Sequence, residues 1–175
     1  RKGADEIEIY FQRSKNLKIK AHKAKIESLI SSDSCGFGIR VFKEGRTGYA
    51  FASGAEKESV DKSLNAAIKI SAQTGQDEAN GLPEKNTSYK NLDLDLYSQD
   101  VARSSVEKKI DMTLEMEQSA LGLDSRIRSA EHVSYGEEIK EVYLVNSKGF
   151  MDRYKSSACG LFLSVIAEEN GRPQT

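Results

Sequence analysis

The sequence predicts an α+β fold, a curved antiparallel β-sheet with two helices packed on one side. Three observations lead to this prediction: alternating apolar and polar residues up to Ser53, two amphipathic stretches in the middle of the chain, and a return to alternation after Arg126. Alternation with period two is typical of strands with one buried face, whereas helices repeat at a period of 3.6 residues. Runs of strands and helices that are segregated in this way favour α+β over a doubly wound parallel sheet.

Residues 36–53 predict a β-hairpin around which the remaining elements are arranged. Residues 43–46 supply the turn, and Gly45 can adopt the positive φ that such a turn usually needs. The returning strand carries Tyr49 and Phe51 on one face and small residues on the other.

The chain before this hairpin predicts further strands. Residues 5–13 alternate, a short turn is expected at 14–16, and residues 17–21 alternate again. Residues 26–30 continue as a less regular strand, which the polar residues 31–34 are expected to break. The first fifty or so residues therefore predict about four antiparallel strands with short connections.

The hairpin is followed by the first predicted helix. Ser53 and Glu56 have the spacing of a capping box, and Gly75 is a natural stop. One face carries the apolar and small residues Val60, Leu64, Ala67, Ile68 and Ser71. We expect this helix to lie on the apolar face of the sheet.

A polar loop over residues 76–91 leads to the alternating run 92–97. The aspartates of this run would suit calcium, but the spacing and the glycine of an EF-hand loop are absent. A solvated strand edge or an extended linker is the preferred interpretation.

The second predicted helix again begins with capping-box spacing, at Ser104 and Glu107, and ends at Gly122 or Asp124. Its expected buried face combines Ile110, Leu114, Glu117 and Leu121, with Met112 and Met116 widening the apolar surface as core filler. The remaining strands are expected at 127–135, 141–146, 150–156 and 157–168, with a turn at 147–149.

Composition limits the function. The chain has 175 residues, and 26 Lys and Arg nearly balance 27 Asp and Glu, which gives no support for direct binding of nucleic acid. No apolar run approaches the length of about 18 residues that a membrane span needs. Cys35 and Cys159 match no metal or redox spacing, which favours reduced, buried thiols in a cytosolic protein.

No catalytic, cofactor-binding or metal-binding residue is assigned. A catalytic zinc site takes about three protein ligands, and His22 and His132 are too far apart in sequence to predict one. Cys159 lies in an apolar strand pattern, which favours an inert thiol over a nucleophile. Arg40 and Arg46 border the hairpin and are interpreted as solvated side chains.

Several segments, in the same order along nearly the whole chain, resemble the amino-terminal domain of the TldD/PmbA family. The segments are Ile26–Ser28, Gly36–Phe42, Glu44–Ser53, Asp95–Tyr97, Val145–Phe150, Tyr154 and Leu163–Glu168. The run Asn146–Gly149 and the lack of a metal motif make the chain more similar to PmbA-type than to TldD-type members.

This resemblance implies a cytoplasmic protease system, historically called a modulator of DNA gyrase, that cleaves unfolded or modified peptides and antitoxins. TldD-type members carry a zinc motif, His-Glu followed by three residues and a histidine, after this domain. PmbA-type members lack it and act as dimer partners. Residues 1–175 are accordingly expected to be one non-catalytic domain of a longer chain, with zinc only in the TldD-type partner or a downstream domain.

We further hypothesise that an edge strand of this domain guides a peptide by strand addition, since short antiparallel strands leave unpaired backbone groups at sheet edges. A scaffold and dimerisation surface is the alternative of equal standing. Two other functions stay open from the sequence: an interaction module that binds gyrase or an antitoxin without proteolysis, and an unrelated α+β ligand-binding domain.

Overall fold

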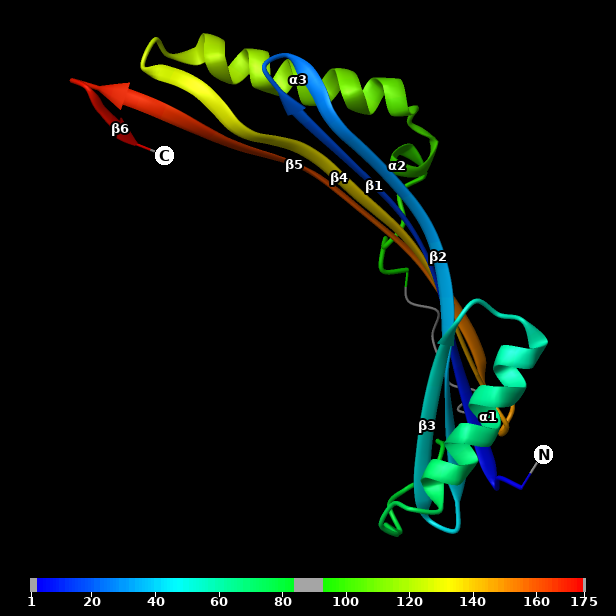
Figure 1. Cartoon of the computed structure of the whole chain (residues 1–175). Helices are drawn as coiled ribbons and strands as arrows, with labels where there is room; N and C mark the ends of the chain where they lie inside the picture. The colour runs from blue at the N-terminus through cyan, green and yellow to red at the C-terminus, as the bar shows by residue number, and fades with distance from the viewer. Residues whose placement is uncertain (1–2, 84–92, 175) are drawn as a thin grey trace. The chain divides into compact units, whose positions relative to one another are not determined.

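The computed structural model describes residues 3–83 and 93–174, which form three helices and a six-stranded antiparallel sheet (Figure 1). The elements are β1 Glu6–His22, β2 Lys25–Lys43, β3 Arg46–Ser53, α1 Lys57–Ser71, α2 Gln99–Arg103, α3 Val106–Leu123, β4 Ile127–Asn146, β5 Met151–Glu169 and β6 Arg172–Gln174. The strand order is β3-β2-β1-β4-β5-β6. The prediction of an α+β fold with an antiparallel sheet is confirmed.

The strands are fewer and longer than the sequence predicted. The turn expected at 14–16 and the break expected at 31–34 are both wrong, because β1 and β2 run through them without interruption. The polar side chains there find partners within the sheet: the Arg13 guanidinium donates to both carboxylate oxygens of Asp33 at 2.9 and 2.6 Å. Because these polar side chains pair between β1 and β2, both polar stretches remain part of the sheet.

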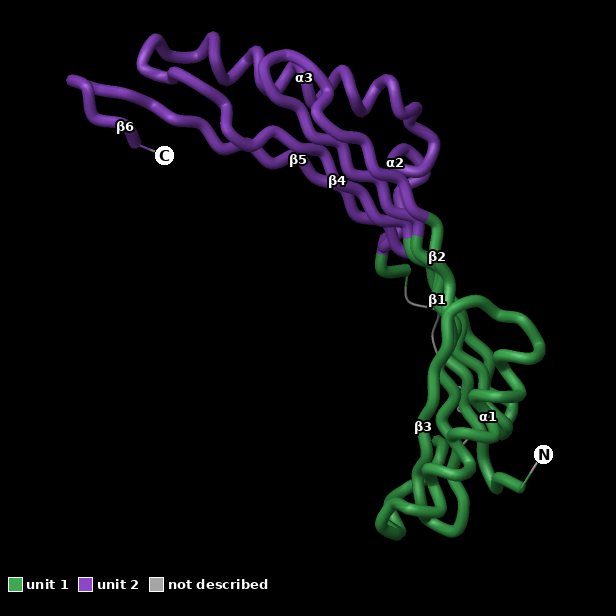
Figure 2. The backbone as a smooth tube through the Cα atoms, in the orientation of Figure 1, with its two compact units in different colours: residues 1–14, 33–94, 140–155 green, residues 15–32, 95–139, 156–175 purple. Residues whose placement is uncertain are grey.

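The chain folds into two compact units, shown in different colours in Figure 2. Unit 1 comprises residues 1–14, 33–94 and 140–155, and unit 2 comprises residues 15–32, 95–139 and 156–175. β1, β2, β4 and β5 contribute residues to both units. None of the described helices is long and apolar enough to cross a lipid bilayer.

In unit 1, α1 packs on the hairpin formed by β2 and β3. The predicted helix face is confirmed: Ala67 and Ser71 are fully buried, and Val60, Leu64 and Ile68 pack against the core. Gly48 allows the close approach, since a Cβ atom there would lie 1.8 Å from the Ala67 carbonyl oxygen. The sheet side of this core consists of Phe37, Ile39 and Val41 with Ile7, Ile9 and Phe11.

The hairpin turn forms as predicted, but the predicted helix start is wrong. Glu44 and Gly45 both adopt positive φ, at 52° and 70°, between the paired residues Lys43 and Arg46. Ser53, the expected cap of α1, is instead the last residue of β3. The helix begins after Glu56, which makes no side-chain capping bond, and it ends at Ser71 and not at Gly75.

The segment after α1 is held against the end of the unit 1 sheet. The Leu82 N–H donates to the Glu6 carboxylate at 2.6 Å, and Lys148 Nζ lies 2.9 Å from the same carboxylate. The hydrogen bonds from Lys148 and from the Leu82 N–H lower the pKa of Glu6. Residues 84–91 of the predicted loop, and Leu92 of the predicted run 92–97, lie outside the described residues.

Of the two interpretations of residues 92–97, the strand edge is wrong for the described part. Residues 93–98 form no regular element, and the Leu96 carbonyl accepts a hydrogen bond from the Ser157 N–H of β5 at 2.8 Å. The alternative interpretation, an extended linker, describes this segment. It leads into α2, a five-residue helix that the sequence did not predict.

In unit 2, α3 packs over β1, β2 and β4 with a face that differs in part from the prediction. Ile110, Leu114 and Met116 pack against the apolar clusters as expected. Leu121 and Met112, however, are exposed, and the most buried helix positions are Lys109, Thr113 and Glu117. The capping residue is Ser105 and not Ser104, because the Ser105 hydroxyl accepts the Lys108 N–H.

Candidate functional site

The outer edge of β3 is the feature of unit 1 most open to a partner. β3 is the terminal strand of the sheet, and its pairing with β2 starts at Lys43 and Arg46 beside the two-residue turn. Hydrogen-bonded and non-hydrogen-bonded pairs alternate from that point. The backbone N–H and C=O groups of Tyr49 and Phe51 therefore point away from β2, where no strand of the described chain pairs with them.

The side chains of the same two residues lie on the outer face of the sheet. Tyr49 is 53% exposed and Phe51 is 77% exposed, and their ring centroids are 6.2 Å apart. The intervening Ala50 packs toward the core beneath α1. β3 thus presents two aromatic rings and a free backbone edge at the same positions.

A hollow of about 330 Å³ adjoins these rings on unit 1. Tyr10 of β1 and Gly36 and Gly38 of β2 contribute to its lining together with Tyr49 and Phe51. The Tyr49 ring lies across Gly38 so closely that a Cβ atom there would lie 2.4 Å from Tyr49 Oη. None of the residues that line the hollow carries a charge at neutral pH.

The charged groups beside the hollow are already engaged. Arg40 donates to Glu8 at 2.6 Å, and its guanidinium lies 5.3 Å from the centroid of the Phe42 ring. Arg46 donates to the Thr74 carbonyl, which ties the turn to the end of α1. The sequence suggested that both arginines are simply solvated, whereas in the structure each has a protein partner. Burial, with a contribution from Tyr154, raises the pKa of Tyr10.

A second cluster, buried beneath α3 in unit 2, joins Lys109, Glu137 and Tyr135. Lys109 Nζ lies 2.6 Å from the Glu137 carboxylate, and these side chains are only 5% and 9% exposed. The Tyr135 hydroxyl donates to Glu137 at 2.6 Å. Burial, reinforced by Glu137, raises the pKa of Tyr135, so the phenol stays protonated. The cluster balances one positive and one negative charge and has the character of a structural ion pair.

Glu117 on the same helix holds the turn between β1 and β2. Its carboxylate, in a side chain that is 2% exposed, accepts the N–H groups of Lys23 at 2.7 Å and Ala24 at 2.9 Å. Lys23 and Ala24 adopt positive φ, at 52° and 55°, which is unfavourable for residues other than glycine. The two charge-assisted hydrogen bonds offset that backbone cost.

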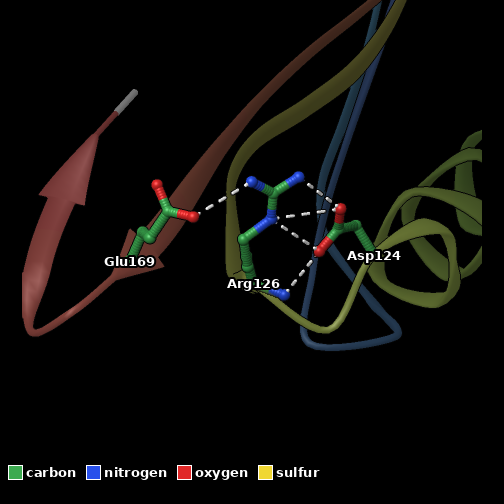
Figure 3. Close-up of polar contacts among 3 residues, drawn as sticks. All are labelled: Asp124, Arg126 and Glu169. Atoms are coloured by element: carbon green, nitrogen blue, oxygen red, sulfur yellow. Dashed lines mark hydrogen bonds and ion pairs between the residues drawn. The ribbon is translucent and has the colours of Figure 1, made fainter.

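An exposed ion cluster lies at the C-terminal end of α3 (Figure 3). The Arg126 guanidinium donates to Asp124 at 2.8 Å and lies 3.4 Å from Glu169. The Asp124 carboxylate also accepts the Arg126 N–H at 2.8 Å. These bonds from Arg126 lower the pKa of Asp124 to about 2. The cluster joins the start of β4 to the end of β5.

The two histidines belong to neighbouring strands of unit 2, whereas the two cysteines belong to different units. His22 ends β1, and His132 lies exposed on β4 beside a hollow of about 420 Å³. The prediction of buried thiols is wrong, because Cys35 and Cys159 are both exposed.

The implied zinc does not fit the side chains that the structure describes. Over residues 3–83 and 93–174, no group of three or more His, Cys, Asp or Glu side chains is arranged to hold a metal ion. No reaction step is derived through zinc in this chain.

Sequence reasoning missed Lys109, Glu137 and the role of Glu117. A signal was present in the helix, since Lys109, Thr113 and Glu117 recur at intervals of four residues along one face. The second signal was a short turn at Lys23 and Ala24 that contains no glycine.

Comparison with known proteins identifies the family. Residues 7–71 match the family model described as PmbA/TldA metallopeptidase domain 1, and residues 99–175 match the model described as PmbA/TldA metallopeptidase central domain. The chain belongs to the TldD/PmbA family. An unrelated ligand-binding domain, one of the alternatives from the sequence, is thereby excluded.

The relatives within this TldD/PmbA family are longer than the chain. It is 27% identical over 169 residues to the metalloprotease PmbA of Escherichia coli O157:H7. The aligned residues cover 96% of this chain and 37% of that protein. It is 28% identical over 166 residues to a metalloprotease PmbA homolog of Haemophilus influenzae, with 94% and 36% covered.

The crystal structure of TldE from Thermococcus kodakarensis has a similar fold. It superimposes with a TM-score of 0.83 at 20% sequence identity, over 99% of this chain and 39% of TldE. At this level of identity the likeness concerns the fold alone.

Proposed function

We propose that this chain is a non-catalytic, amino-terminal part of a PmbA-type subunit in a cytoplasmic peptidase system. In this role it contributes surfaces for guiding an unfolded peptide and for assembling a homo- or heterodimer with a TldD/PmbA-type subunit. Peptide-bond hydrolysis, and the zinc that supports it, belong to the TldD-type partner or to a further part of the protein.

One observation carries the proposal: a chain that matches metallopeptidase family models has a free sheet edge, and its described side chains form no cluster suited to a metal ion. The edge is that of β3 at Tyr49 and Phe51. The described side chains contain no group of three potential metal ligands, whereas a catalytic zinc takes about three protein ligands. A sheet edge binds the backbone of an extended peptide and so tolerates many sequences.

The peptidase role is tested by measuring hydrolysis of an unfolded fluorogenic peptide by the chain alone, by a TldD-type subunit alone and by their mixture. We expect no turnover by the chain alone and higher turnover by the mixture than by the TldD-type subunit alone. Metal analysis by mass spectrometry should find no stoichiometric zinc in the chain. Turnover by the chain alone, or one tightly held zinc per chain, would contradict the proposal.

Assembly is tested in parallel by sedimentation velocity of the same mixture. A complex of the two chains is the expected result. A complex that forms without any gain in turnover would favour the interaction module without proteolytic role. Two separate species would contradict the assembly role.

A further inference from the structure

We infer that the outer edge of β3 and the adjoining hollow form a selective site for an extended peptide segment with an uncharged aromatic or aliphatic side chain. Tyr49 and Phe51 supply both the backbone groups that pair with the segment and the rings that receive this side chain. The inference rests on the proposed function, and it adds a chemical preference and a location to the guidance role.

The edge determines the conformation of the occupant. The backbone groups of Tyr49 and Phe51 point outward at alternate positions, which is the pattern that an added β-strand satisfies. A helical partner would leave these donors and acceptors unpaired. The occupant is therefore an extended backbone.

The hollow determines the chemistry of the side chain. Its lining combines aromatic rings, among them Tyr10, Tyr49 and Phe51, with uncharged polar residues such as Gln12 and Ser34, and it contains no charged residue. A charged side chain placed there would lose hydration without gaining an ion pair. Arg40 and Glu8, which line an adjoining hollow with Tyr10, Gly38 and Tyr49, already bind each other at 2.6 Å. An aromatic or aliphatic side chain gains apolar contact and ring stacking.

The site is formed before any peptide arrives. Tyr49 is fixed across Gly38, where no side chain intervenes, and β3 is fixed from its other face by α1 at Gly48. Because little has to be ordered on binding, even a small contact area can contribute to affinity. Gly38 thus has a specific role, which is to leave room for the Tyr49 ring beside the hollow.

The test uses tryptophan fluorescence, because the chain contains no tryptophan and a single tryptophan in a peptide reports only on the peptide. A short peptide of alternating threonine and valine carries the tryptophan at its centre. Two matched peptides replace the valine two positions from the tryptophan, which lies on the same face of an extended strand, by aspartate, or carry N-methyl groups on the edge-pairing amides. We expect the tryptophan emission to shift to the blue on binding, and each modification to weaken binding about tenfold.

The protein variants locate the site. Phe51→Ser is expected to weaken binding of the parent peptide about tenfold, because the ring contributes most of the exposed apolar surface at this edge. Leu123→Ser is the control, since Leu123 is similarly exposed, at 82%, but lies in α3 of unit 2. It should leave the affinity unchanged.

Equal binding of the parent, aspartate and N-methyl peptides would overturn the inference, as would unchanged binding by the Phe51→Ser variant. Concentration-dependent dimerisation of the chain that Phe51→Ser abolishes would show that a second copy occupies the edge, and would overturn it as well. Since this assay contains no TldD-type subunit, its outcome is separate from the turnover assay. If the chain raises turnover but Phe51→Ser leaves peptide binding unchanged, only the present inference is refuted.

Discussion

The two units solve the same problem, a helix packed on antiparallel strands, with different chemistry. In unit 1 the contact between α1 and β3 is apolar, and Gly48 allows the helix backbone to lie close to the strand. In unit 2 the deepest positions of α3 are Lys109, Thr113 and Glu117. Close packing needs only the right shape, whereas a buried polar face needs a partner for each of its charges.

The largest expected effect is a break in the polar contact of unit 2 by Lys109→Met. The substitution leaves the buried Glu137 carboxylate without its cation and should lower the free energy of unfolding by about 4 kcal/mol. Urea denaturation followed by circular dichroism measures the loss. The double variant Lys109→Met, Glu137→Gln removes both charges and should recover much of the stability.

Lys62→Met is the control for this comparison. Lys62 is exposed and pairs with Glu58 one helical turn away at 2.7 Å, so its loss should cost no more than about 0.5 kcal/mol. Equal effects of the two lysine substitutions would show that the ion pair beneath α3 is not important for stability.

Gly48→Ala tests the apolar contact of unit 1. The added methyl group would overlap the Ala67 carbonyl, so α1 must shift away from β3, and we expect a loss of about 3 kcal/mol in the free energy of unfolding. Gly136→Ala, where nothing lies within 4 Å of the new atom, should change stability little. A tolerated Gly48→Ala with an unchanged unfolding midpoint would refute the close approach.

The two hairpin turns sharpen the comparison through Glu117→Gln. Both turns use two residues with positive φ, but the turn in unit 1 contains Gly45, whereas that in unit 2 contains Lys23 and Ala24. The amide can accept only one of the two backbone N–H groups, so a loss of about 2 kcal/mol in the free energy of unfolding is expected in thermal or urea unfolding.

Ala24→Gly should instead raise the free energy of unfolding by about 1 kcal/mol, because glycine adopts positive φ without strain. A destabilising Ala24→Gly would contradict this reading of the turn.

Asp124→Asn should have the smallest effect, and one that depends on pH. The pKa of Asp124 is lowered from 3.8 to about 2 in the folded chain, so its charge stabilises the fold above the unfolded value of 3.8. This contribution disappears as the pH falls from about 4 towards 2. The variant keeps the oxygen that caps the Arg126 N–H, so the stability difference from the parent reports the ionised carboxylate and its second bond to the guanidinium. A difference as large at pH 2 as at pH 7 would exclude this cause.

In unit 1, local signals in the sequence were sufficient for the hairpin and for the apolar face of α1. The hairpin could be predicted because its turn and its alternation lie within twenty residues, and the apolar face of α1 follows from its own spacing. The free edge of β3 could not be located, since it depends on which strand is terminal in the sheet. The outward position of Tyr49 and Phe51 follows only once the opposite face is known to meet α1.

The sequence was less informative for unit 2 because its partners are distant along the chain. Glu117 binds turn residues that lie 94 and 93 positions away, and no local pattern announces such a pair. The false break at residues 31–34 has a similar origin, since the hydrogen bonds between Arg13 and Asp33 span 20 positions. Polar residues predicted loops there only because their partners were not visible in the local sequence.

Because β1, β2, β4 and β5 each pass through both units, no single cut in the polypeptide releases either unit whole. A recombinant piece ending at residue 71 would retain β1 yet lack β4, its neighbour in the sheet. The 17 residues of β1 would then form an unpaired strand edge exposed to water, which favours self-association in solution. Dissecting this region by truncation is thus self-defeating, and point substitution is the sounder tool.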